Sequence, residues 1–194
     1  MRRRHKLVLP ALVLALAAAA VPVYAQKIPP ARPAVSQLQA PPVSPDPQNT
    51  TASFGDWVLR CQRTGEGAQA QRSCEIVQTL QIAGQGPIAQ IAFGRAAGSS
   101  PLKVTVLLPH NVTVSKSVTL GLGEKDAKPV DLVWRRCLPA GCLADADLPD
   151  EALKRWRGEA GQGRLKFLDA AGREAVLPFS FRGLAQGLDS LAKA

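Results

Sequence analysis

The sequence has 194 residues, with 24 basic and 15 acidic side chains, a formal net charge of +9 and four cysteines. The first 25 residues carry four of the basic side chains and no acidic one, so the formal charge of the remainder falls by four, from +9 to +5. That remainder keeps one histidine and no tyrosine or methionine, which excludes multi-histidine metal sites, methionine ligation of copper and tyrosine platforms for nucleic acid. We therefore expect no metal, no cofactor and no nucleic-acid partner.

Residues 1–25 have the pattern of a secretory signal peptide. The basic segment MRRRHK precedes an apolar stretch rich in Leu, Val and Ala, and small residues occupy Val23 and Ala25. This pattern predicts cleavage after Ala25 and a mature protein in the periplasm or outside the cell. An uncleaved membrane anchor is the alternative, but Pro10 and Pro22 interrupt the apolar run.

Residues 26–53 form a segment that contains seven prolines. Proline removes backbone donors and disfavours helix in the residue before it, so the segment is predicted to be an extended, disordered linker. A proline-containing ligand for a partner is the alternative function of such a segment.

The chain from Phe54 to Ala194 is long enough, at about 140 residues, for one domain with its own core. Apolar and polar residues alternate there in short runs bounded by Gly, Pro, Asp and Ser, which predicts strands. The pattern indicates a mainly β fold, an antiparallel sandwich or barrel-like domain, and its clearest hairpin runs from Arg164 to Phe181. The predicted strand segments are FGDWVLRC, SCEIVQTLQI, PIAQIAF, LKVTVLL, VTVSKSVTLGL, PVDLVWRRC and RLKFLDAAGREAVLPFSF.

Two short helices are expected among these strands. In DLPDEALKRWRG, Asp147 is the predicted N-cap, Pro149 lies in the first turn and Gly158 ends the helix. At the C-terminus, Leu184, Leu188 and Leu191 have helical spacing, so this segment should dock on the sheet.

The four cysteines lie in the predicted domain as two local pairs, Cys61 with Cys74 and Cys137 with Cys142. An exported protein meets an oxidising environment, so two structural disulfides are the simplest prediction. A labile redox pair and a zinc site are the alternatives. Both usually use C-x-x-C spacing, which neither pair has.

The domain sequence contains a series of short motifs in a fixed order: FGDW with Cys61, CE at 74–75, LLP at 107–109, VTLGL at 118–122, CLPAGC at 137–142 and PFSFRGLAQGLDSL at 178–191. These motifs in this order resemble the invasion-associated locus B family of exported bacterial proteins. The resemblance covers nearly all of residues 54–194 and implies a compact, disulfide-stapled, β-rich protein of the periplasm or cell surface, linked in pathogens to host-cell invasion. The family contributes no catalytic residues. The sequence departs from the family pattern at residues 109–112, PHNV, where family members often have P-x-G-V.

A catalytic site would have to use His110, the one histidine outside the signal peptide, together with nearby carboxylates. No nucleophile motif accompanies His110, and the carboxylates cluster where a helix is predicted to begin. We therefore predict a protein that is not an enzyme, with a hydrolase-type periplasmic enzyme as the alternative. The carboxylates are Asp145, Asp147, Asp150 and Glu151.

Basic residues around CLPAGC and the following helix suggest a positively charged face. The predicted binding face comprises Arg135, Arg136, Arg155 and Arg157, with Lys154 and Arg164 nearby. Such a face suits an anionic component of the envelope or of a host surface, an unidentified protein, or peripheral contact with a membrane. The sequence does not indicate an oligomeric state.

Overall fold

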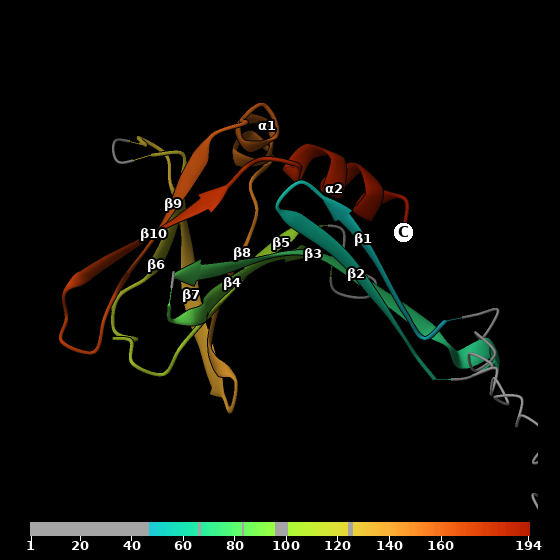
Figure 1. Cartoon of the computed structure of the whole chain (residues 1–194), viewed down its shortest axis with the longest axis horizontal. Helices are drawn as coiled ribbons and strands as arrows, with labels where there is room; N and C mark the ends of the chain where they lie inside the picture. Colours follow the sequence, from blue (N-terminus) through green and yellow to red (C-terminus); the bar gives the residue numbers. More distant parts are fainter. Residues whose placement is uncertain (1–46, 66, 83, 96–100, 124–125) are drawn as a thin grey trace, which may run out of the picture. The chain divides into compact units, whose positions relative to one another are not determined.

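The computed structural model describes residues 47–65, 67–82, 84–95, 101–123 and 126–194. The predicted signal peptide and the linker up to residue 46 lie outside the described residues. Over the described ranges the chain forms ten strands, two α-helices and a short 3-10 helix (Figure 1). The strands are β1 (Asn49–Phe54), β2 (Trp57–Thr64), β3 (Gln71–Ile82), β4 (Gly86–Gly94), β5 (Lys103–Leu108), β6 (Val118–Gly121), β7 (Val130–Leu138), β8 (Gly141–Asp147), β9 (Gln162–Leu168) and β10 (Glu174–Ser180). The helices are η1 (Gly67–Gln69), α1 (Asp150–Arg157) and α2 (Leu184–Ala192).

The ten strands form one hydrogen-bonded series in the order β1-β2-β3-β4-β5-β8-β7-β6-β9-β10, and every neighbouring pair is antiparallel. Strand β7 joins the two halves, because its first residues pair with β6 and its later residues pair with β8. The mainly β, antiparallel prediction is confirmed. The predicted hairpin from Arg164 to Phe181 is also present as β9 and β10, with Leu165 opposite Leu177.

The sheet bends so that β3 and β10, far apart in the strand order, come into contact. Five aromatic side chains fill the space that this bend encloses, with neighbouring ring centroids 4.9 to 6.4 Å apart. Such tilted and edge-to-face pairs add to the burial of apolar surface that holds the core together. The five are Trp57, Phe93, Trp156, Phe179 and Phe181, each 2% exposed or less.

The structured region begins earlier than Phe54. Strand β1 starts at Asn49 and pairs with β2 along its whole length, from Asn49 opposite Gln62 to Phe54 opposite Trp57. Residues 49–53, which were predicted to belong to the linker, are therefore part of the sheet. Their sequence, NTTAS, lacks the apolar alternation of a half-buried strand, and four of the five are fully polar. Pairing with β2 decides their conformation.

Both predicted helices are present, but the first begins differently from the prediction. Asp147 is the last residue of β8, where its carboxylate lies 2.9 Å from Lys103 Nζ, so it does not cap α1. Pro149 is the N-cap and makes no side-chain cap bond, while Gly158 ends the helix as expected. Leu184, Leu188 and Leu191 of α2 are buried, and the helix packs on β1, β2 and β3 (Figure 1).

Candidate functional site

Both predicted disulfides are present. Cys61 and Cys74 lie directly opposite each other in β2 and β3, and Cys137 and Cys142 do so in β7 and β8. CLPAGC is thus a closed clip at the end of the β7–β8 hairpin. All four thiols are used in these bonds, so none is a metal ligand in this structure. Elsewhere in the described ranges, no group of three or more His, Cys, Asp or Glu side chains is placed to hold a metal ion.

The clip lies next to a β-bulge in β7. Trp134 pairs with Ala144 and Arg136 pairs with Leu143, so Arg135 is the extra residue between them. A bulge turns the side chains that follow it. Beyond this one, residues 135–140 are all exposed, including the apolar side chain of Leu138. The hairpin end therefore presents two arginines and a leucine on a strand pair closed by a disulfide.

The four arginines of the predicted binding face do not lie together. Arg155 contacts the segment that precedes β7, through Asp126 and the carbonyl of Lys128, whereas Arg136 lies near the opposite end of β7. Six residues of strand separate Val130 from Arg136, which is roughly 20 Å at the usual rise per residue. The structure thus brings Arg135 and Arg136 together at the clip and places Arg155 and Arg157 on α1.

Three of these arginines make ion pairs within the domain. Arg135 lies 2.9 Å from Asp145, and Arg157 pairs with Asp189 of α2. Arg155 pairs at 2.9 Å with Asp126, whose side chain is 5% exposed. No carboxylate in the described part of the chain pairs with Arg136. Of the predicted face, Arg136 is the cation most available to a partner.

The carboxylate of Asp126 organises the loop between β6 and β7. Burial raises its pKa, but the backbone N–H groups of Leu122 and Lys128 and the guanidinium of Arg155 outweigh that effect and hold the pKa of Asp126 below its usual value. Arg155 is therefore a structural residue that joins α1 to this loop.

His110 and the carboxylates proposed for an enzyme lie apart. His110 follows β5, and its Nε2 lies 2.8 Å from the carbonyl oxygen of Leu138 in the clip. Strand β5 sets Leu108 opposite Cys142 at this end and Lys103 opposite Asp147 at the other. Five residues of strand correspond to about 17 Å. Asp150 and Glu151 lie beyond that far end, in α1. His110 is therefore out of hydrogen-bond reach of Asp147, Asp150 and Glu151, a reach that general acid–base catalysis by these residues would require.

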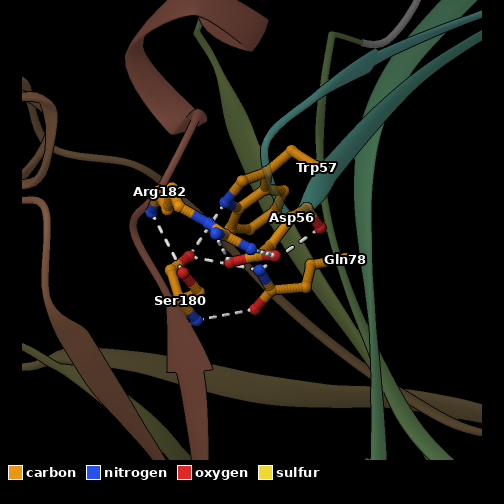
Figure 2. Close-up of polar contacts among 5 residues, drawn as sticks. All are labelled: Asp56, Trp57, Gln78, Ser180 and Arg182. Atoms are coloured by element: carbon orange, nitrogen blue, oxygen red, sulfur yellow. Dashed lines mark hydrogen bonds and ion pairs between the residues drawn. The ribbon is translucent and has the colours of Figure 1, made fainter.

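Figure 2 shows a polar network that joins the two ends of the domain sequence. Trp57 Nε1 donates to the carbonyl of Ser180 at 2.8 Å, and Arg182 Nε donates to Asp56 at 3.0 Å. Gln78 donates to the same Ser180 carbonyl at 3.2 Å and accepts from the Ser180 N–H at 2.8 Å. The bond to Arg182 lowers the pKa of Asp56 and raises that of Arg182. The network fixes β10 against β2 and β3.

Two of the sequence motifs supply the residues of this network and therefore have a structural role. FGDW supplies Asp56 and Trp57, while PFSFRGL supplies Ser180 and Arg182. Gly183 has a φ of +89°, and a Cβ there would lie 1.9 Å from the carbonyl oxygen of Phe54. Only glycine therefore allows the two motifs to meet this closely.

Sequence reasoning did not identify Gln78, the one described polar residue that is buried, at 4% exposed. The signal was available: Gln78 interrupts the apolar run IVQTL of a strand. A buried amide needs partners, so its position implied a polar network. The partner, Ser180, could not be identified because it lies 102 residues away.

The fold and these features define a disulfide-stapled antiparallel β domain. The sequence model of the invasion associated locus B (IalB) protein family matches residues 57–192, and this chain belongs to that family. The crystal structure of invasion associated protein B from Bartonella henselae has a similar fold, with a TM-score of 0.60 and 21% sequence identity over 74% of this chain and 96% of that chain. No curated protein matches the chain.

Proposed function

We propose that this IalB-family chain is an exported protein that acts by binding rather than by catalysis, at the cell envelope or at a host surface. Two disulfides are typical of proteins that fold in an oxidising compartment, and the N-terminal sequence has the pattern of a signal peptide. No helix within the described ranges is long and apolar enough to cross a membrane. These features support a protein of the periplasm or of the cell exterior.

The observation that carries the binding proposal is the end of the β7–β8 hairpin. The bulge at Arg135 and the clip at Cys137 and Cys142 hold Arg136 and Leu138 exposed on a rigid strand pair. A rigid, exposed element loses little conformational entropy when it binds. We propose that this end binds an anionic component, with Arg136 as its main charge and Arg135 as its second.

The binding test compares two double variants that remove the same charge. Arg135→Gln with Arg136→Gln should weaken retention on immobilised heparin and on vesicles of phosphatidylglycerol and phosphatidylcholine by about fivefold or more, and wild-type binding should fade with salt. Lys154→Gln with Lys193→Gln, at exposed positions away from the clip, is the matched control. Equal losses in both variants would mean that binding follows net charge alone. Heparin and vesicles distinguish a glycan from a lipid as the anionic component.

The rival enzyme is tested at His110. If the protein acts by binding, no turnover of ester, phosphoester or peptide substrates should depend on His110. A hydrolytic activity that disappears with His110→Ala would overturn the proposal of a binding protein.

Export is tested by sequencing the N-terminus of protein recovered from the periplasm or the medium. Cleavage after Ala25 predicts a mature chain that begins at Gln26. Recovery of most molecules with Met1, in the cytoplasmic fraction, would contradict export.

A further inference from the structure

The β7–β8 hairpin ends in apolar residues that extend past the neighbouring strand. The last pair between β5 and β8 is Leu108 with Cys142, so residues 138–141 lie beyond the end of β5 (Figure 1). The side chain of Leu138 is 39% exposed, and the two residues that follow it are exposed as well. None of these three side chains has a polar atom. The apolar tip consists of Leu138, Pro139 and Ala140.

The apolar surface continues on the outer face of the sheet, which is turned away from the aromatic core. Leu108 and Cys142 are buried and point inward. Because side chains alternate along a strand, their neighbours Leu107 and Leu143 point outward. These two leucines lie directly opposite each other and are half-buried. Apolar side chains therefore extend from the tip across β8 to β5.

A hollow of about 300 Å³ joins this outer face to the apolar tip. Ile88 of β4, Leu107 of β5 and Ala140 of the tip form part of its wall. Of the described side chains that line the hollow, only Gln90 is polar, and none belongs to a helix. A contiguous apolar surface of this kind, open to solvent, is typical of a site that contacts a membrane or another protein.

Arg136 is the cation beside the apolar tip. It is exposed and lies on the same face of β7 as Leu138, two residues before it, which is roughly 7 Å along the strand. The three segments that form this end of the domain, residues 80–90, 106–111 and 136–143, contain no acidic side chain. An anion can therefore approach Arg136 without meeting a carboxylate of these segments.

The carboxylates of the adjoining segments are paired with arginines. Asp145 of β8 lies 2.9 Å from Arg135. Asp169, just after β9, lies 2.8 Å from Arg173. No carboxylate in the described ranges pairs with Arg136. The uncompensated charge beside the tip is thus positive, which complements an anionic surface.

The backbone of the apolar tip has few free polar groups. Pro139 has no N–H. The carbonyl of Leu138 accepts from His110 Nε2 at 2.8 Å, and Leu138 pairs with Gly141 across the hairpin. Backbone groups without a partner strongly oppose entry into a lipid phase, so these bonds make it easier for the tip to leave water. They also give His110 a positioning role.

We propose that the apolar tip inserts into the surface of an anionic membrane, with Leu138 at the boundary of the acyl chains and Arg136 at the lipid phosphates. The headgroup layer on each side of a bilayer is about 5–7 Å deep, which matches the separation of these two residues along the strand. The inference rests on the function proposed above for this hairpin end and names a lipid surface as the partner. A glycan could bind the arginines, but it offers nothing apolar to Leu138.

The test measures co-sedimentation with vesicles of the chain that begins at Gln26, because the basic and apolar residues 1–25 would themselves bind lipid. Mixed vesicles of phosphatidylglycerol and phosphatidylcholine should bind at least about tenfold more tightly than vesicles of phosphatidylcholine alone. Leu138→Asn should weaken binding to the mixed vesicles by about tenfold and leave retention on heparin unchanged. Val176→Asn, at a similarly exposed apolar position in β10, is the matched control and should change neither.

The outcomes distinguish failure of insertion from failure of the proposed function. If Leu138→Asn binds the mixed vesicles as wild type does, while Arg135→Gln with Arg136→Gln weakens that binding, insertion is overturned and anion binding by the hairpin end stands. Wild-type retention on heparin without binding to vesicles would overturn the lipid as the partner. If the double arginine variant behaves as wild type on heparin and on vesicles, both proposals are overturned.

Fluorescence measures insertion independently of affinity. In Leu138→Trp the added indole should shift its emission to the blue with mixed vesicles and be quenched by lipids brominated on their acyl chains. Val176→Trp should respond no more than wild type, which has the same three native tryptophans. Absence of quenching in Leu138→Trp would overturn insertion. Sedimentation without lipid identifies a second copy as the occupant if the chain dimerises and Leu138→Asn makes it monomeric, and that result would also overturn the proposal.

Discussion

Gln78 and Ser180 exchange two hydrogen bonds across 102 residues of sequence, at 3.2 and 2.8 Å. One amide side chain thereby satisfies both backbone groups of a residue on another strand. Since Gln78 lies in β3 and Ser180 ends β10, the contact joins strands that are separated by six others in the sheet order. The bend of the sheet depends on this polar contact as well as on the aromatic core.

Replacement of Gln78 should destabilise the domain. In Gln78→Met the side chain keeps its size but leaves the half-buried N–H and C=O of Ser180 without this partner, at a cost of about 1–3 kcal/mol. Gln81→Met, exposed on the same strand, is the control and should stay within about 0.5 kcal/mol of wild type. Urea unfolding measures both. Equal stability of the two variants would show that water replaces the amide.

The two adjacent basic residues of α1 should behave differently. Arg155→Gln removes the cation beside the buried Asp126 and should lower the free energy of unfolding by about 1–3 kcal/mol. Lys154→Gln, on the exposed side of the helix, should have almost no effect. Thermal and urea unfolding of the two single variants measures the difference. If Arg155→Gln is as stable as wild type, the ion pair of Arg155 with Asp126 does not stabilise the domain.

Asp126 should make the stability of the domain depend on pH. Its pKa is lower in the folded protein than in the unfolded chain, so the ionised carboxylate contributes stability above about pH 4, and this contribution is lost as the pH falls through the folded pKa. Asp126→Asn cannot titrate there.

The difference in unfolding free energy between wild type and Asp126→Asn should therefore be largest near neutral pH and shrink in acid. Urea titrations at a series of pH values measure this difference. If the difference in unfolding free energy between wild type and Asp126→Asn does not change with pH, the hydrogen-bond geometry of this side chain stabilises the domain and its charge does not.

The two disulfides should contribute unequally. Cys61 and Cys74 are 13 residues apart and Cys137 and Cys142 are 5 apart. In the chain-entropy model these loops correspond to roughly 3 and 2 kcal/mol, so the double serine variant of the first pair should be the less stable. Denaturant unfolding of the two double variants compares them. If the double serine variant of Cys137 and Cys142 is the less stable one, the clip also stabilises the folded β7–β8 hairpin directly.

Short-range patterns in the sequence predicted much of this fold. Alternation identified strands around Trp57, Ile76 and Ile91, and local spacing identified both disulfides and the buried leucines of α2. The polar strand β1 was missed because its conformation comes from pairing with β2. Asp147 was assigned as a cap because the sequence does not reveal that Lys103 lies beside it.

The features of the candidate site that the sequence did not predict depend on long-range contacts. The sequence grouped Arg155 with Arg136 because both are basic and near the clip in the chain. In three dimensions Asp126 holds Arg155 at one end of β7, and Arg136 is exposed near the other. Which arginines are available to a partner is thus decided by acids on distant segments.

The pairing of each cysteine with its nearest cysteine neighbour in the sequence has a consequence for biogenesis. In a chain that crosses a membrane from its N-terminus, Cys61 meets Cys74 before Cys137 has emerged, and Cys137 then meets Cys142. An oxidase that joins cysteines in their order of appearance therefore produces the native pairing directly. If the chain is exported as proposed, we expect its maturation to need an oxidant but no disulfide isomerase.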